Sequence, residues 1–470
     1  MPGDMLGLSA SELALRLRRR DIGAEELVRA SLQRIGAVNA TFNAFTAVFA
    51  DEAIAAARVA DAALKAGGDT GPMLGLPISI KDFTPTKGQL TTRGSRTLAD
   101  NIGAFDPAIV RRLKAAGAIV VAKTTTPEFA HSGFTKSPLW GVTRNPWDPS
   151  RSPGGSSGGA AVSVVTRAVA LAEGTDMGGS VRIPAALSGC VGLKPSKGRI
   201  PIEITATVFD HISHFGPLAR SVADAALFLR VTEGPDELDI QSQINPTPLP
   251  DILSPDVRGL RLAASPDLGI YNVAPPVARN FQRSLDALRE AGAHVEEVDL
   301  GWQAAHVSDW VDYWAVFLAA QCGHLLDRDR ALLDPDFATL LDHGLKLDAV
   351  TIERGAIRRT EQWQKLARVF ATHDALLCPT MARQAPAATD RDADFEAPDA
   401  SGRLNGLDMT AIFNNVAACP AIAVPNWSAG DGLPTSVQIV GRRFDDPTVL
   451  RVAACLEHHA GWPQWPPLTA

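Results

Sequence analysis

The sequence predicts a single large α/β domain in which helices cover a central sheet. The first observation is that short apolar runs alternate with helical segments over residues 76–172. The second is that 46% of the 470 residues are hydrophobic, enough for a sizeable core. The third is that no internal repeat or convincing linker divides the chain. We therefore treat residues 1–470 as one domain with an N-terminal helical part (1–70), a motif-rich core (74–200) and a variable part (300–410).

The N-terminal part is expected to be helical over residues 9–66. Ser9, followed three positions later by Glu12, matches a capping box, and the apolar residues after it recur at helical intervals. The β-branched run at 76–80 is bounded by turn residues and predicts a buried strand. Lys81 then falls at the C-terminal end of that strand.

Helices and strands alternate after this point. An Asp-Pro pair at 106–107 begins a helix that runs to residue 117, because aspartate caps helices and proline suits their first turn. The apolar run 118–122 predicts a strand, residues 160–165 suit a helix, and residues 168–172 predict the next strand. Strands that alternate with helices favour parallel pairing, so a mostly parallel sheet is expected.

The C-terminal half contains the same kinds of element in a less regular order. Residues 389–402 are acidic and polar and are expected to form an exposed loop. Trp302, Trp310 and Trp314 would either line an apolar pocket or belong to the core, and the core is favoured. Helices are also predicted at 218–229, at 277–291 and through 457, and strands at 261–264, 376–379, 421–425 and 435–441.

Composition limits the classes of function. The net charge of −7 is spread along the chain, so nucleic-acid binding is not expected. The five cysteines are scattered without a CxxC pair, which favours a reducing compartment over a disulfide framework. Neither an apolar run of about 18 residues nor a basic start leading into an apolar stretch is found, so neither a membrane span nor a secretion signal is expected. The expected location is the cytoplasm.

One lysine and two serines carry the expected chemistry. Ser156 lies in the turn Ser-Pro-Gly-Gly-Ser-Ser-Gly-Gly, and Ser180 lies in Gly-Thr-Asp-Met-Gly-Gly-Ser-Val-Arg-Ile-Pro. Glycine reaches backbone angles that let consecutive N–H groups converge on one point. Two such turns, together with Lys81 at a strand end, suggest a nucleophile, a proton relay and an oxyanion hole. That combination indicates acyl transfer.

Lys81 is the expected base of this reaction. A serine hydroxyl is a poor nucleophile until a base removes its proton, and a lysine is a base only when it is neutral. Burial away from carboxylates would lower the pKa of Lys81 in that direction. Ser156, in the first glycine turn, could bridge the lysine and the nucleophile. The developing oxyanion could be bound by four consecutive backbone N–H groups, those of Met177, Gly178, Gly179 and Ser180.

In these motifs the chain resembles the amidase signature family. The resemblance includes Lys81, both glycine turns and the motifs at 189–199 and 216–224, and more loosely the stretch 432–441. It covers most of the chain but is dense only over residues 74–199. Three separated motifs in the right order make the resemblance specific.

The resemblance implies a Ser–cisSer–Lys triad. It makes Ser180 the nucleophile that forms the acyl-enzyme, Lys81 the base, and Ser156, usually preceded by a cis peptide bond, the bridging serine. Ser157, Asp176 and Arg182 would be structural support. The implied fold is a large mixed sheet with helices on both faces, compatible with the predicted elements.

The resemblance also suggests where a substrate would bind. In relatives, the stretch matching residues 127–141 lines the acyl site, which makes Phe129, Ala130 and His131 candidate substrate contacts. A plain packed loop is almost as well supported there. Met177 stands where the family often has threonine or another residue, but only its backbone N–H would be used.

Two other interpretations of these motifs are weaker. Residues 154–158 match the Gly-x-Ser-x-Gly pattern of a nucleophile elbow, but an elbow follows a strand, and a proline-broken loop at 145–153 precedes this one. His211 and His214 are candidates for a triad histidine or for metal ligands. No second ligand cluster has metal spacing, so neither a metal nor a cofactor is expected.

The sequence therefore predicts a cofactor-independent hydrolase that cleaves the C–N bond of a small-molecule carboxylic amide. Anilides, esters, hydrazides and carbamates would suit the same machinery. Two alternatives stay open: the ammonia-generating amidase component of a tRNA-dependent amidotransferase, which needs partner proteins, and a catalytically dead binding protein with the same fold. A homodimer also stays open, and no membrane or nucleic-acid partner is expected.

Overall fold

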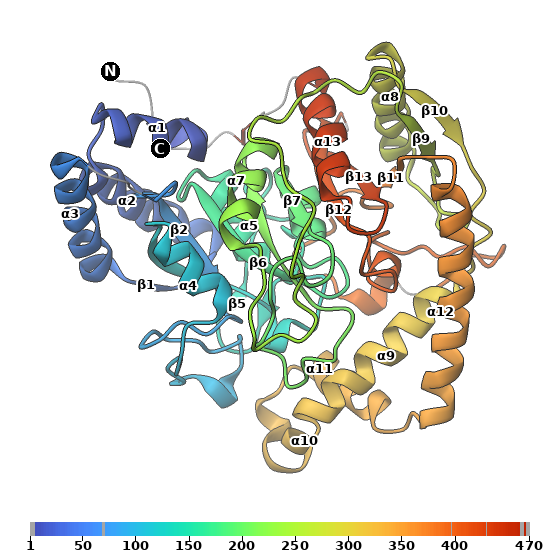
Figure 1. Ribbon diagram of the computed structural model, residues 1–470. Coiled ribbons are helices and arrows are strands. Elements are labelled where there is room, and N and C mark those ends of the chain that lie inside the picture. Colours follow the sequence, from blue (N-terminus) through green and yellow to red (C-terminus); the bar gives the residue numbers. More distant parts are fainter. Residues whose placement is uncertain (1–4, 68–70, 396, 429, 461–464, 467–470) are drawn as a thin grey trace.

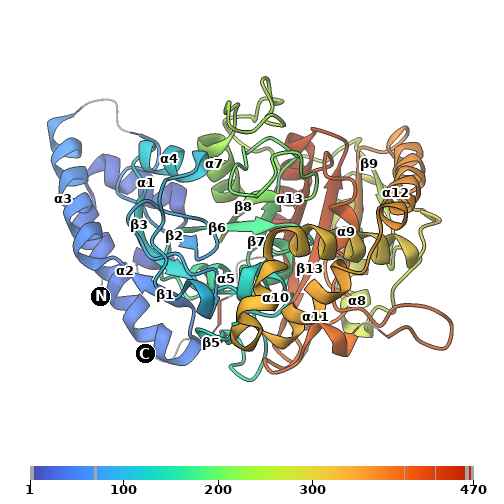
Figure 2. The same ribbon diagram turned by 90° about the horizontal axis from the view of Figure 1, so that it is seen from below.

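The computed structural model describes residues 5–67, 71–395, 397–428, 430–460 and 465–466. Within them an eleven-stranded sheet runs through the molecule, and helices pack around it (Figures 1 and 2). In sheet order its strands are β1 (Phe45–Val48), β3 (Ile119–Thr124), β2 (Pro77–Lys81), β6 (Leu171–Asp176), β8 (His214–Ala219), β7 (Val191–Lys194), β12 (Ala421–Ser428), β13 (Pro434–Gly441), β11 (Ala375–Pro379), β9 (Arg261–Ala264) and β10 (His294–Glu297).

The sheet is mixed, and the predicted preference for parallel pairing is wrong. In the described residues six of its ten strand pairings are antiparallel. Parallel pairing is confined to β3–β2–β6 and β10–β9–β11. Parallel neighbours need a crossover of a dozen or more residues, whereas β12 and β13 are joined by a short connection that allows only antiparallel pairing. Strand–helix–strand alternation therefore accounts for these two parallel groups and not for the rest of the sheet.

Thirteen α-helices surround the sheet in the described part of the chain. Helices α1 to α4 lie beside the β1 edge of the sheet, and α9 to α12 form a group at the lower right of Figure 1. None of the described helices is long and apolar enough to cross a membrane. The helices are α1 (Ala10–Arg19), α2 (Ala24–Phe42), α3 (Ala50–Ala66), α4 (Ala108–Ala115), α5 (Gly158–Val165), α6 (Arg182–Ser188), α7 (Val222–Thr232), α8 (Pro275–Glu290), α9 (Ala305–Cys322), α10 (His324–Asp329), α11 (Pro335–Gly344), α12 (Ala349–Phe370) and α13 (Asp446–Ala460).

Two strands lie where helix was predicted. Asn43 adopts a left-handed conformation (φ 49°) that ends α2, and the next residues form β1, which pairs with β3 at the sheet edge. Further along, all six residues of β8 are buried between β6 and β7, although helix was expected from residue 218. Helix α7 begins only after Ser221, whose side chain caps it. A short apolar run does not distinguish a buried strand from a helix by periodicity, which explains both errors.

Two parallel strands and one buried helix position the candidate site. Strands β2 and β6 are neighbours, so their carboxyl ends, with Lys81 and Asp176, lie at the same edge of the sheet. Helix α5 is buried along its whole length in the main hydrophobic core. A side chain at Gly159 would place its Cβ 2.4 Å from the Thr125 hydroxyl, so this close approach requires glycine. The turn before α5 is thereby held against the ends of β2 and β3.

Candidate active site

Lys81 is the charged centre of the site. Its side chain is fully buried, and its Nζ donates to the Ser156 Oγ at 2.7 Å and to the Thr175 Oγ1 at 2.9 Å. Burial lowers the pKa of Lys81 to about 7, although the charges of Glu173 and Asp176 oppose the shift. A substantial fraction of Lys81 is therefore neutral near pH 7, and the neutral amine is a base in contact with a serine hydroxyl.

Two residues of β6 that the sequence pattern did not single out hold this lysine. Glu173 accepts hydrogen bonds from the Lys81 backbone N–H and from the Thr84 hydroxyl, both at 2.9 Å. Burial raises the pKa of Glu173. Glu173 and Thr175 are two positions apart and so lie on one face of β6, whose parallel neighbour is β2. Polar residues at alternate positions of an otherwise buried strand were the signal that could have revealed them.

Ser156 follows a cis peptide bond, Gly155–Ser156, as the family resemblance implies. Ser156 is fully buried. A Cβ at Gly155 would lie within 3 Å of the backbone of Ser132 and Gly133, so the turn passes there only as glycine. The Ser157 N–H donates to the Ser180 carbonyl oxygen at 3.1 Å and ties the two glycine turns together.

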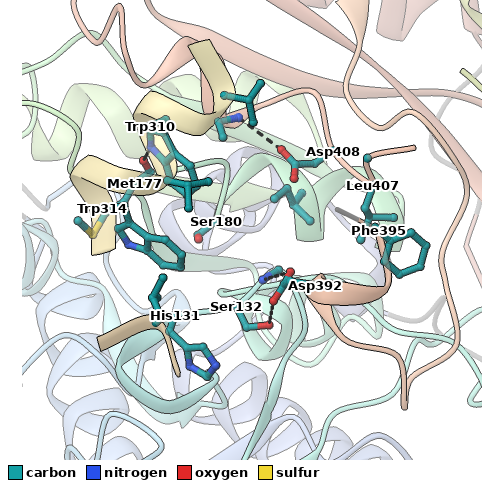
Figure 3. A pocket seen from close by; sticks show the side chains of 18 of the residues that line it. His131, Ser132, Met177, Ser180, Trp310, Trp314, Asp392, Phe395, Leu407 and Asp408 are labelled. Carbon is teal, nitrogen blue, oxygen red and sulfur yellow. Dashed lines mark hydrogen bonds between the residues drawn. The ribbon is translucent and has the colours of Figure 1, made fainter. Parts of the chain in front are cut away.

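Ser180 lies at the centre of a cavity of about 640 Å³ (Figure 3). Ser156 and Thr175 line the same cavity. In the described residues no hydrogen bond joins the Ser156 and Ser180 hydroxyls, and the Ser180 hydroxyl has no other protein partner. The structure therefore brings the lysine and both serines to one place, with the Ser180 oxygen open to a ligand.

The four backbone N–H groups proposed to bind the oxyanion differ in their hydrogen bonds within the protein. The Gly179 N–H donates to Asp176 Oδ1 at 2.8 Å and is engaged within the protein. The N–H groups of Met177, Gly178 and Ser180 have no protein partner in the described residues. Gly179 has φ 121°, and a Cβ there would lie 1.8 Å from the Thr410 Oγ1. Only glycine suits that position.

Asp176 and Arg182 form an ion pair that holds this turn. Both side chains are fully buried, and the guanidinium donates to both carboxylate oxygens, at 2.8 and 2.9 Å. Burial disfavours the charge of Asp176, but Arg182 and Asn414 outweigh it and lower the pKa of Asp176 below its usual value. Arg182 also donates to Asn414 and Gln438. A paired charge with every donor engaged suits a structural role.

The cavity is lined by both apolar and acidic side chains. Trp310 and Trp314 stack with ring centroids 5.0 Å apart and lie on one side of Ser180, whereas Asp408, Leu407 and Phe395 lie on the other (Figure 3). The charged and titratable side chains that line it are four aspartates, two histidines and one tyrosine: Asp312, Asp336, Asp392, Asp408, His131, His343 and Tyr271. A neutral or cationic ligand suits this lining better than a carboxylate.

Two of the three candidate substrate contacts line the cavity. Ala130 and His131 line it, and the His131 Nε2 lies 3.7 Å from the Asp334 Oδ1. Phe129 is not among the lining residues; its buried ring stacks on Phe337 at 5.2 Å. Phe129 therefore supports the wall from behind.

The variable part supplies cavity walls that sequence reasoning missed. Trp302 is buried in the core as expected, but Trp310 and Trp314 line the cavity. The stretch predicted to be an exposed loop brings in Asp392, which accepts from the Ser132 hydroxyl and from the Gly133 N–H at 3.1 Å. Local composition does not reveal such contacts, because they join segments about 260 residues apart.

The weaker interpretations gain no support. The ring of His211 packs on Tyr313, and the ring nitrogens of His214 face the carbonyl oxygens of Ile212 and Ala417. Among the described residues no group of histidine, cysteine or carboxylate side chains could hold a metal ion. No strand directly precedes the turn at 154–158, so the nucleophile-elbow pattern lacks its structural context.

Comparison with known proteins gives consistent matches. The family model described as Amidase matches residues 26–450. The chain is 36% identical to an acylamidase of Rhodococcus erythropolis over 459 residues, which cover 97% of this chain and 96% of the relative. It is 31% identical to a component of the glutamyl-tRNA(Gln) amidotransferase of Geobacter metallireducens, with 98% of each chain covered. A bacterial aryl acylamidase described as one of the amidase signature enzymes superposes with a TM-score of 0.90 at 29% identity, covering 97% of this chain and 96% of that one.

Proposed function

The chain belongs to the amidase signature family and is a hydrolase of carboxylic amide C–N bonds; from that premise we propose that it works through an acyl-enzyme on Ser180. The observation that carries the proposal is the 2.7 Å hydrogen bond from Lys81 to Ser156 beside a cavity centred on Ser180. A buried lysine whose pKa is about 7 can accept a proton at neutral pH.

In the first half-reaction, neutral Lys81 takes the proton of the Ser156 hydroxyl, and Ser156 takes the proton of Ser180. The Ser180 Oγ attacks the carbonyl carbon and forms a tetrahedral intermediate. The negative oxygen is bound by the N–H groups of the Met177–Ser180 segment that have no protein partner in the described residues, those of Met177, Gly178 and Ser180. Ser156 then returns a proton to the nitrogen, the C–N bond breaks, and the amine leaves.

In the second half-reaction, water occupies the place of the amine. Ser156 and Lys81 take its proton, the hydroxide attacks the acyl carbon, and the acid leaves as Ser180 recovers its proton. Each step uses only groups that the cavity presents. Esters, anilides, hydrazides and carbamates offer the same carbonyl and a comparable leaving group.

The wall of Trp310 and Trp314 favours substrates with an apolar or aromatic group, and acylamidases among the relatives agree with this class. The four aspartates around the cavity disfavour substrates with a free carboxylate. Neutral aryl or alkyl amides are therefore the proposed substrate class.

A second candidate is the amidase component of a tRNA-dependent amidotransferase, favoured by the relative from Geobacter metallireducens. Such a component takes ammonia from glutamine, whose α-carboxylate calls for a cationic partner. The acidic lining of this cavity weighs against it. Release of ammonia from glutamine faster than release of amine from neutral anilides would reverse the order of the two candidates.

Labelling with a fluorophosphonate tests the proposal. The reagent should modify the wild-type chain once, on the peptide that contains Ser180, and Ser180→Ala should abolish both labelling and anilide hydrolysis. Ser157→Ala is the matched control, because this serine lies in the same buried region but, within the described residues, its Oγ hydrogen-bonds only to the Thr175 carbonyl oxygen, at 3.4 Å. Labelling or turnover that persists in Ser180→Ala would refute the assignment.

Other expectations stay predictions. The five cysteines are all buried and unpaired, which fits a reducing compartment such as the cytoplasm. A homodimer and the proposed division into 1–70, 74–200 and 300–410 likewise stay predictions.

A further inference from the structure

The backbone segment between Asp176 and Ser180 contains two peptide units that the protein holds in different ways. A trans peptide unit is planar, and its carbonyl and N–H point in opposite directions. A group that binds the carbonyl therefore sets where the N–H points. The carbonyl of Met177 belongs to the same unit as the Gly178 N–H, and the carbonyl of Gly178 to the same unit as the Gly179 N–H.

The second unit is held at both ends. Its Gly179 N–H donates to Asp176 at 2.8 Å. Its carbonyl oxygen, that of Gly178, lies 2.7 Å from the Thr410 hydroxyl, which is also 2.7 Å from Asp408 and has a single hydrogen for the two acceptors. Because both ends are engaged within the protein, this unit is part of the framework of the turn.

The first unit is held only at its carbonyl, and by a residue from the variable part. The indole N–H of Trp310 donates to the Met177 carbonyl oxygen at 2.9 Å. In the described residues the opposite end of this unit, the Gly178 N–H, has no protein partner. The indole ring also closes on this backbone, since a Cβ at Gly178 would lie 2.2 Å from Trp310 Cζ2. Trp310 thus holds one face of the unit by contact and its oxygen by a hydrogen bond.

We propose that Trp310 is a positioning residue for the oxyanion hole: its indole N–H orients the Met177–Gly178 peptide so that the Gly178 N–H faces the substrate oxygen. A hydrogen bond to the carbonyl also polarises the peptide and strengthens its N–H as a donor. The inference rests on the proposed function, because it assumes that Ser180 attacks a carbonyl beside this segment.

The packing around Trp310 supports this role. Helix α9, which carries Trp310, is anchored to α12 by an ion pair between Asp309 and Arg358. Trp314, one turn later on α9, stacks on Trp310 at 5.0 Å. Both rings line the cavity on the same side of Ser180 (Figure 3). The residue that orients the donor is therefore also part of the surface on which the substrate lies.

The sharpest test replaces the indole N–H and nothing else. β-(3-Benzothienyl)alanine has a sulfur atom in place of the indole N–H and nearly the same shape as tryptophan, and it is incorporated at position 310 by nonsense suppression. The same replacement at Trp302 is the matched control, because its indole N–H also donates to a backbone carbonyl oxygen, that of Gln362 at 3.3 Å, but the residue lies in the core and is not among those that line the cavity.

At position 310 we expect kcat for a neutral anilide to fall about tenfold while KM stays within about twofold. This is at the upper end of the loss expected for an ordinary hydrogen bond and less than the 100-fold or greater loss from deleting a whole oxyanion donor. A trifluoromethyl ketone, which adds to Ser180 as a tetrahedral oxyanion, should bind more weakly by the same factor, whereas the product acid should bind as before. Position 302 should leave kcat and ketone binding unchanged.

Three results would overturn the inference: an unchanged kcat at position 310, a rise in KM with kcat unchanged, or equal losses at both positions. Trp310→Phe provides the same comparison by ordinary mutagenesis. If the phenylalanine variant fails to fold, the result for the benzothienylalanine variant stands as the test. Ser180→Ala keeps the two proposals apart. If Ser180→Ala stays active, the proposed function fails; if it is inactive but the 310 isostere has wild-type activity, only the role of Trp310 fails.

Discussion

The two sides of the cavity are built on different principles. On the side of β2, β6 and the glycine turns, polar atoms are fully buried and bound to one another, as in the contacts of Lys81 with Ser156 and of Asp176 with Arg182. On the side of α9 and residues 392–411, half-buried rings and carboxylates face the cavity. The difference teaches that reaction chemistry depends on fixed hydrogen bonds, whereas substrate choice depends on side-chain surfaces, most of which can change without disturbing those bonds; Trp310, which holds the Met177 carbonyl, belongs to both.

The largest expected effect lies on the first side. Lys81→Met should lower kcat about 10⁴-fold, since it removes the only base in contact with Ser156 among the described residues, and removal of a triad member typically has an effect of this size. The measurement is anilide hydrolysis under single-turnover conditions. Lys194→Met is the matched control: Lys194 is equally buried, with its pKa also lowered by burial to about 7, but its Nζ contacts carbonyl oxygens such as that of Cys419.

A folded Lys194→Met variant should retain catalysis. Equal losses in the two lysine variants would show that a buried lysine matters for folding only and would remove the distinction between the two sides of the cavity. Circular dichroism and the thermal midpoint separate this outcome from a chemical one.

The pH profile should show the titration of Lys81. Burial lowers its pKa to about 7, and only the neutral amine accepts a proton. Below pH 7, kcat/KM should therefore fall towards tenfold for each unit of pH, and above pH 7 it should level off. The profile is recorded with a neutral anilide, whose own charge does not change over the range. A profile that is flat from pH 5.5 to 8, or that falls as pH rises through 7, would rule out Lys81 as the base.

On the second side, substitutions that leave Trp310 and its hydrogen bond to Met177 in place should change binding more than rate. Leu340→Ala removes apolar surface from the cavity wall and should raise KM for an aryl amide about fivefold, with kcat within about twofold, as expected for about 1 kcal/mol of lost burial. Leu345→Ala, at an exposed position just after the same helix, is the control and should change neither. An equal fall in kcat for Leu340→Ala would mean that the wall also governs the chemistry.

Sequence reasoning was most successful where function depends on contiguous motifs. Lys81, Ser156 and Ser180 lie within two glycine turns and one strand end, and their residue types specify both the local backbone and the chemistry. The structure brings these three residues together at the edge of the sheet. Glycine was informative because at positions such as Gly179 no other residue has room.

Sequence reasoning was weakest where contacts join distant segments. The Gly179 N–H was expected in the oxyanion hole, but the direction of a peptide unit depends on its partners, here Asp176 and Thr410. Trp310 reaches the Met177 carbonyl from 133 residues away. The antiparallel pairings of the sheet and the short strand β1 were missed because both depend on neighbours that the local pattern does not contain.

Direct trapping of the acyl-enzyme tests the central claim most directly. The chain is mixed with an activated aryl ester, quenched with acid within the first turnover, and digested, and the peptides are mapped by mass spectrometry. We predict one acyl group per chain, attached to Ser180, that accumulates in the wild type and is absent from Ser180→Ala. An acyl group on Ser156 or Ser157, or steady turnover without any covalent adduct, would contradict the account.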